Sequence, residues 1–148
     1  MFKVLIAEDE PPIMRMIKST LESVDSDFKV TECCINGKNA VEKLKNEDFD
    51  IVITDIKMPI MTGIELAGWI YQNKPDTKVI IVSGYSDFEY ARKALEYKVF
   101  DYLLKPISKD KVSELTQRIK SEIAEKNKMF AENNTIVILA CAGAYLLY

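Results

Sequence analysis

The sequence predicts an α/β domain in which five parallel strands alternate with five helices. Short β-branched runs recur along the chain, and each is followed by apolar residues at helical spacing. This alternation is typical of a doubly wound (βα)5 architecture, with helices on both faces of the sheet. The runs IVIT and VIIV are continuously apolar, as expected of strands buried on both faces. At 148 residues, the chain has the length of one ordinary domain.

Apolar runs and helix-capping residues mark the limits of the predicted strands and helices. The expected strands are residues 3–7, 29–34, 51–54, 78–82 and 101–104. The first helix follows Pro11 and Pro12, because proline suits the first turn of a helix. Asn36 is the expected N-cap of the second helix. Two later helices begin with capping boxes, in which a hydroxyl and a carboxylate three residues apart each accept a backbone N–H; the pairs are Thr62 with Glu65 and Ser86 with Glu89.

The end of the chain is predicted to differ from the rest. A fifth helix begins near Ser108 and continues toward Phe130, which makes it longer than a small sheet requires. The last segment, TIVILACAGAYLLY, carries no charge but is shorter than the roughly 20 residues of a membrane span. We interpret it as a buried element, either helix or strand. We therefore expect one domain over residues 1–125, and a linker-helix end with an apolar tail over 126–148 that begins a truncated further region.

The composition excludes several classes of function. The chain has no histidine, which removes serine-histidine hydrolases, cysteine-histidine proteases and histidine-ligated zinc. A net charge of −3 argues against a nucleic-acid footprint over the whole domain. The adjacent Cys33 and Cys34 do not indicate a disulfide framework, and the N-terminus lacks the apolar core of a signal peptide. We expect a cytoplasmic protein.

The predicted strands bring reactive side chains to one edge of the sheet. Parallel strands end on the same side, so residues that follow them gather there whatever their separation in sequence. Strand one is followed by Glu8, Asp9 and Glu10, and strand three by Asp55. With the flavodoxin-like strand order 2-1-3-4-5, strands one and three are neighbours, and Asp9 and Asp55 share a pocket.

Two further side chains join these acids at the same edge. Strand four ends at Ser83, and strand five is followed by Lys105. Clustered carboxylates either raise a pKa or recruit a divalent cation, and oxygen ligands suit Mg²⁺. A carboxylate-bound metal in turn favours phosphate, with Lys105 and the Ser83 hydroxyl as partners for phosphoryl oxygens. The central carboxylate, Asp55, is the candidate nucleophile.

The chain resembles the receiver domains of bacterial two-component response regulators. The resemblance covers roughly residues 1–125 and is carried by VLIAEDEPP, DIVITDIKMPIMTGIEL, VIIVSGYSDFEYARKALEY and FDYLLKPI. It implies that Asp55 accepts a phosphoryl group from the phosphohistidine of a sensor histidine kinase. It also implies that Asp9, Asp55 and the backbone carbonyl of Lys57 ligate Mg²⁺, with Glu8 acting through water. Glu8 departs from the family, where this acid is commonly aspartate.

The resemblance assigns roles to the other residues of the edge. Lys105 contacts a phosphoryl oxygen, and the bond between Lys105 and Pro106 is expected to be cis. Ser83 and Tyr102 resemble the pair of residues that switches: the hydroxyl moves toward the phosphoryl group and the ring turns inward. The phosphorylated form is expected to form a homodimer.

The segment SGYSDFEYARKALEY resembles the receivers of AraC-type transcriptional regulators in particular. It implies a DNA-binding output, which this chain does not contain, and no membrane partner. Two alternatives stay open: a Mg²⁺-dependent phosphatase with Asp55 as its nucleophile, and an interaction module that is never phosphorylated. Lys57 disfavours the phosphatase, which is expected to place a second carboxylate two residues after the nucleophile.

Overall fold

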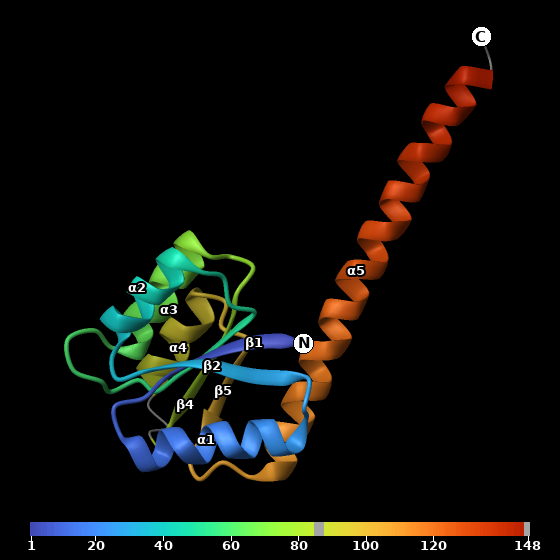
Figure 1. Cartoon of the computed structure of the whole chain (residues 1–148). Coiled ribbons are helices and arrows are strands. Elements are labelled where there is room, and N and C mark those ends of the chain that lie inside the picture. Colours follow the sequence, from blue (N-terminus) through green and yellow to red (C-terminus); the bar gives the residue numbers. More distant parts are fainter. Residues whose placement is uncertain (85–87, 147–148) are drawn as a thin grey trace. The chain divides into compact units, whose positions relative to one another are not determined.

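The computed structural model describes residues 1–84 and 88–146, without the side chains of Phe88 and of residues 135–146. The chain divides into two compact units, Met1–Val112 and Ser113–Tyr148. The first unit contains the five strands and the helices between them (Figure 1). The capping box predicted at Ser86 lies outside the described residues.

The elements alternate along the chain as predicted. The strands are β1 (Phe2–Ala7), β2 (Phe28–Cys34), β3 (Ile51–Thr54), β4 (Lys78–Ser83) and β5 (Asp101–Leu104). The helices are α1 (Pro11–Val24), α2 (Gly37–Asn46), α3 (Gly63–Asn73), α4 (Phe88–Glu96) and α5 (Lys109–Leu146).

The sheet has the predicted topology. All neighbouring strands are parallel, and their order is β2-β1-β3-β4-β5. In the first unit, α2, α3 and α4 lie on one face of the sheet and α1 lies on the other (Figure 1). The doubly wound fold class is therefore confirmed. This order places β1 beside β3 at the centre of the sheet, where the chain direction across the sheet reverses.

The hydrophobic core of the first unit lies between the sheet and its helices. Every residue of β3 is buried, as its continuous apolar run predicted. The layer of helices α2 and α3 contributes Leu44 and Leu66, both completely buried against residues of the central strands such as Leu5 and Val52. Each such side chain contributes roughly 1.5–3 kcal/mol through burial. The packed core holds the strand ends in fixed positions.

The structure contains the predicted N-caps at Asn36 and Thr62, and the cap at Thr62 differs from the prediction in one hydrogen bond. The Asn36 side chain accepts a hydrogen bond from the Asn39 N–H at 2.8 Å, as an N-cap does. Thr62 accepts the Glu65 N–H at 3.2 Å. The Glu65 carboxylate, however, accepts the Thr62 hydroxyl at 3.3 Å instead of a backbone N–H. Half of the predicted capping box is therefore formed.

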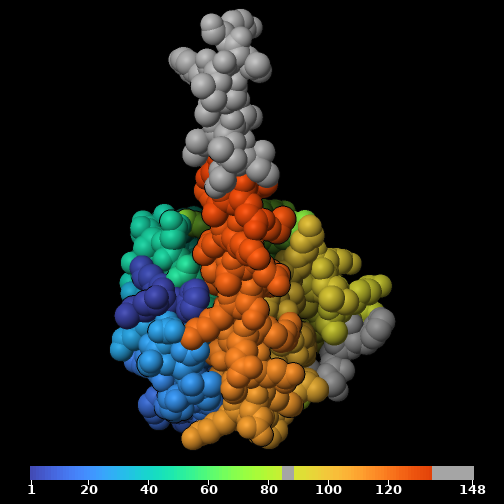
Figure 2. All heavy atoms as spheres, turned by 90° about the vertical axis from the view of Figure 1, so that its right-hand side faces the viewer, coloured from blue at the N-terminus to red at the C-terminus, as the bar shows by residue number. Residues whose placement is uncertain are grey.

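Helix α5 is longer than predicted. It has 38 residues and continues to Leu146, so the backbone of the apolar tail is helical up to that point. No proline interrupts α5, and its only glycine is Gly143, so the strongest helix breakers are nearly absent from it. Residues 124–134, within the part of α5 drawn in orange in Figure 2, are all exposed. Among the described residues, no helix is long and apolar enough to cross a membrane.

Candidate functional site

The carboxyl edge of the sheet collects the side chains that the sequence pointed to. Ala7 and Thr54 are paired in the sheet, so the residues that follow them, Glu8 and Asp55, leave adjacent strands. The Asp55 N–H donates to the Ala7 carbonyl at 3.0 Å, which extends the pairing by one residue. On the other side, the Lys105 N–H donates to the Ser83 carbonyl at 2.8 Å. The predicted convergence of strand ends is present.

Three charged side chains are in contact at this edge. The Lys105 Nζ lies 3.0 Å from Asp55 Oδ2 and 3.4 Å from Glu8 Oε2. The side chains are 18% exposed for Lys105, 10% for Asp55 and 0% for Glu8. The ammonium group therefore bridges two carboxylates in a poorly hydrated place, where charge–charge interactions are strong. Asp55 is the more accessible of the two acids.

Burial and charge shift two pKa values in this cluster. Burial, reinforced by the negative charge of Asp55, raises the pKa of Glu8 from 4.5 to about 7, although Lys105 opposes this. Burial on its own would lower the pKa of Lys105, but its hydrogen bond with Asp55 and the charges of Asp55 and Glu8 outweigh it. The pKa of Lys105 is therefore raised. The cluster holds more negative charge than one ammonium neutralises.

An acidic group beside this cluster fits a divalent cation. Carboxylate oxygens of Glu8, Asp9 and Glu10 all lie within 4.8 Å of one another, with Glu8 buried and the other two exposed. Oxygen donors with excess negative charge are what Mg²⁺ prefers. Glu8 also contacts Lys105 directly, and its Oε1 accepts the Glu10 N–H at 3.3 Å.

The backbone around Asp55 contains contacts that the sequence reading missed. The Ile56 N–H donates to Asp55 Oδ1 at 2.7 Å, which fixes one carboxylate oxygen and leaves Oδ2 for Lys105. The buried hydroxyl of Thr54 donates to the Asp55 carbonyl at 2.8 Å. A Cβ on Gly63 would overlap that same carbonyl oxygen. The sequence does contain one sign of the Thr54 contact, namely a hydroxyl side chain in the otherwise apolar strand IVIT.

The remaining predicted site residues take different positions. Ser83 is completely buried at the end of β4. Tyr102, on β5 beside Ile81, is half-buried and packs against the core. Lys57 is exposed in the loop after Asp55. The Lys105–Pro106 peptide bond is cis.

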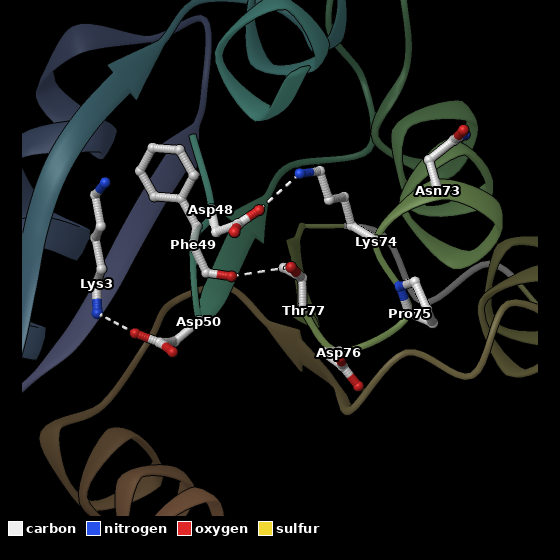
Figure 3. A pocket seen from close by; sticks show the side chains of 9 residues that line it. All are labelled: Lys3, Asp48, Phe49, Asp50, Asn73, Lys74, Pro75, Asp76 and Thr77. Atoms are coloured by element: carbon white, nitrogen blue, oxygen red, sulfur yellow. Dashed lines mark hydrogen bonds and ion pairs between the residues drawn. The ribbon is translucent and has the colours of Figure 1, made fainter. Parts of the chain in front are cut away.

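A polar cavity lies at the opposite, amino edge of the sheet. A cavity of about 350 Å³ is lined by nine residues, among them Asp48, Asp50, Lys74 and Thr77 (Figure 3). Lys74 Nζ is 2.7 Å from Asp48 Oδ1, and the Thr77 hydroxyl donates to the Phe49 carbonyl at 2.9 Å. The polar groups in these contacts are paired with one another. Two carboxylates at the carboxyl edge are buried whereas Asp48 is 90% exposed, so the acidic site there is the better candidate for chemistry.

The parallel sheet of order β2-β1-β3-β4-β5 thus carries a buried cluster of Asp55, Lys105 and Glu8 at its carboxyl edge. The sequence profile described as "Response regulator receiver domain" matches residues 4–120. The chain therefore belongs to the response regulator receiver family.

Related proteins agree with this family. The chain is 34% identical over 127 residues to the "Uncharacterized transcriptional regulatory protein YesN" of Bacillus subtilis (strain 168). The aligned region covers 86% of this chain and 34% of that protein. It is 33% identical over 126 residues to the "Transcriptional regulatory protein HptR" of Staphylococcus aureus (strain NCTC 8325 / PS 47), covering 85% and 49%. The chain thus spans about a third to a half of the length of these relatives.

A solved structure agrees as well. The receiver (REC) domain of AraT, a response regulator from Geobacillus stearothermophilus, superposes with a TM-score of 0.76 at 31% identity. The superposition covers 85% of this chain and 98% of that one.

Proposed function

We propose that this receiver domain is switched by phosphorylation of Asp55. The donor is the phosphohistidine of a sensor histidine kinase, and the reaction depends on Mg²⁺. The observation that carries the proposal is the Asp55 carboxylate, 10% exposed and held between the Ile56 N–H and the Lys105 ammonium. A carboxylate fixed in this way is oriented for attack before the donor arrives.

The transfer exchanges one bond to phosphorus for another. A carboxylate oxygen of Asp55 attacks the phosphorus, the bond between phosphorus and the imidazole nitrogen breaks, and the departing imidazole takes up a proton. The product is an acyl phosphate on Asp55. Asp9, Asp55 and the Lys57 carbonyl would hold Mg²⁺, which would supply positive charge to offset the phosphoryl oxygens. Lys105 supplies a second positive charge on the other side.

The same site is proposed to drive the conformational switch. A phosphoryl group on Asp55 adds acceptor oxygens close to Lys105 and to the end of β4, where Ser83 lies. The Ser83 hydroxyl then donates to a phosphoryl oxygen, and Tyr102 moves further into the space behind it. The buried Ser83 and the half-buried Tyr102 support this coupling.

The output is proposed to be transcriptional. Two relatives are described as transcriptional regulatory proteins, and both are at least twice as long as the matched region. We infer that phosphorylation promotes a homodimer and that DNA is bound through an output region of the AraC type. We place receiver function in residues 1–125 and the beginning of the output connection in 126–148. The protein is proposed to act in the cytoplasm, where kinase domains are accessible.

Intact-mass measurement with acetyl phosphate tests the proposal. Wild type and Asp55→Asn are incubated with the donor, with and without Mg²⁺. We expect a gain of one phosphoryl group in wild type that requires Mg²⁺ and is absent from Asp55→Asn. Because the substitution keeps the size of the side chain, circular dichroism should be unchanged.

Three results would contradict the proposal. Labelling that persists in Asp55→Asn would place the acceptor elsewhere. Absence of both an adduct and released phosphate in wild type would indicate a phosphorylation-independent module. Rapid release of phosphate from small phosphoesters other than acyl phosphates would favour a phosphatase.

A further inference from the structure

The loop between β3 and α3 is closed by hydrogen bonds of its own backbone. The Gly63 N–H donates to the Ile56 carbonyl at 2.8 Å, which joins the two ends of the loop. Within it, the Met61 N–H donates to the Pro59 carbonyl at 2.8 Å, forming a γ-turn around Ile60. This phosphoacceptor loop, residues 56–62, directly follows Asp55.

The γ-turn is strained. Ile60 has φ of 71°, a left-handed conformation that is unfavourable for a β-branched side chain. The side chain is 76% exposed, so little packing of its own compensates for the strain. The conformation therefore depends on contacts that the neighbouring residues make.

One such contact comes from the start of α2. The Gly37 N–H donates to the Met61 carbonyl at 3.2 Å. The N–H groups in the first turn of a helix have no partner within the helix, so this one is available for the loop. A Cβ at position 37 would lie 2.9 Å from both the Met61 carbonyl oxygen and Met61 Cγ. Only glycine allows this close approach, because the carbonyl is backbone and cannot move alone.

The loop held by Gly37 also carries groups of the candidate site. It starts at Ile56, whose N–H binds Asp55 Oδ1 at 2.7 Å. It contains Lys57, whose carbonyl is the proposed backbone ligand of Mg²⁺. A displacement of the loop at Met61 is therefore transmitted to both the acceptor carboxylate and the metal site.

We propose that Gly37 is a positioning residue for phosphoryl transfer. It holds the strained phosphoacceptor loop against the start of α2 and thereby fixes the Asp55 carboxylate and the Lys57 carbonyl. This inference rests on the proposed function and adds to it a residue on a different element, distant in sequence from the acceptor.

The test compares Gly37→Ala with wild type and with Gly68→Ala. Gly68 is a matched control because a Cβ there would also be crowded, at 3.0 Å, but by the Tyr97 ring between α3 and α4. Mg²⁺ affinity is measured by isothermal titration calorimetry, and the rate constant of labelling is measured at saturating acetyl phosphate and Mg²⁺. Unfolding in urea shows that each variant is folded at the assay temperature.

Gly37→Ala is expected to lower the labelling rate constant and the Mg²⁺ affinity by roughly tenfold, the range found when supporting contacts of a metal site are lost. Gly68→Ala should stay within about twofold of wild type, a difference of about 0.4 kcal/mol. Adding Met61→Ala to Gly37→Ala removes Met61 Cγ and should restore part of both losses.

Three results would overturn the inference. They are wild-type rate and affinity in Gly37→Ala, an equal loss in Gly68→Ala, and a loss that only follows the unfolded fraction. If wild type itself takes up no phosphoryl group, the proposed function fails, and the Mg²⁺ affinities still decide the role of Gly37.

Discussion

The two edges of the sheet each hold a lysine–aspartate pair, but in different surroundings. At the amino edge, Lys74 and Asp48 are 2.7 Å apart with side chains 26% and 90% exposed (Figure 3). At the carboxyl edge, Lys105 and Asp55 are 3.0 Å apart with side chains 18% and 10% exposed. The shorter pair is the better hydrated one.

Burial, more than the distance between the charges, explains why the carboxyl pKa values at the two edges shift in opposite directions. The hydrogen bond and charge of Lys74 lower the pKa of Asp48, as for any exposed carboxyl beside a cation. At the carboxyl edge, Glu8 shares the same ammonium with Asp55, and its pKa is raised because the group is desolvated and close to a second negative charge. An exposed pair adds little to stability, whereas a buried cluster with two carboxylates and one ammonium is destabilised by its excess negative charge until a cation neutralises it.

Replacing the lysine of each pair by alanine should give the largest difference in stability between the two edges. Lys105→Ala leaves Glu8 and Asp55 facing each other without a cation and should lower the free energy of unfolding by about 3 kcal/mol in the absence of metal. Lys74→Ala should leave the urea midpoint unchanged because its pair is exposed. Urea unfolding at pH 8 with a chelator measures both, and equal losses would show that burial does not distinguish the edges.

The pH dependence of stability should reveal the buried acid. The pKa of Glu8 is about 7 in the folded state and 4.5 as its ordinary value, so between these pH values the folded state retains a proton that the unfolded state has lost. The free energy of unfolding should therefore fall as pH rises from about 4.5 to 7, by about 3 kcal/mol, and then level off.

Glu8→Gln should remove this fall and be more stable than wild type at pH 8 without metal. Glu47→Gln, at the amino edge beside Lys3, is the control and should retain the wild-type pH profile. Urea unfolding from pH 4 to 8 measures the three curves. The assignment to Glu8 would be wrong if the Glu8→Gln curve had the wild-type slope.

Replacing Ile60 in the γ-turn beside the carboxyl edge should change stability less than Lys105→Ala does, and should raise it. Ile60→Gly should raise the free energy of unfolding by about 0.5–1 kcal/mol, because glycine adopts φ of 71° without steric cost. Ile35 is the control: it is also exposed, in the loop before α2, and its φ is not positive. Ile35→Gly should lower stability by a similar amount through chain entropy, and the same sign for both variants would argue against strain at Ile60.

Deletion of residues 135–148 should have the smallest effect. The preceding residues 124–134 are exposed, so the unit of the sheet should retain its stability within about 0.5 kcal/mol. Urea unfolding of the shortened chain measures this. A loss above about 1 kcal/mol would show that the tail completes the core of the receiver.

The sequence alone determined the fold class and the edge at which the chemistry lies. Strands and helices have different apolar periods, and both periods are readable in the chain. In a parallel sheet the strand ends must gather on one side, so Glu8, Asp55, Ser83 and Lys105 could be placed together without coordinates. The strand order 2-1-3-4-5, expected from the flavodoxin-like class, is confirmed. The length of α5 was underestimated, because the apolar tail is equally compatible with helix and strand.

Only the tertiary structure decided how these groups contact one another. Glu8 is completely buried, and Lys105 bridges it to Asp55. Both features depend on packing between strands that are distant in sequence. The γ-turn at Ile60 contradicts the local preference of isoleucine and exists because the loop is held by Gly37 and Gly63. Local propensity follows from a few neighbouring residues, whereas close approach of two backbones depends on where the whole chain has folded.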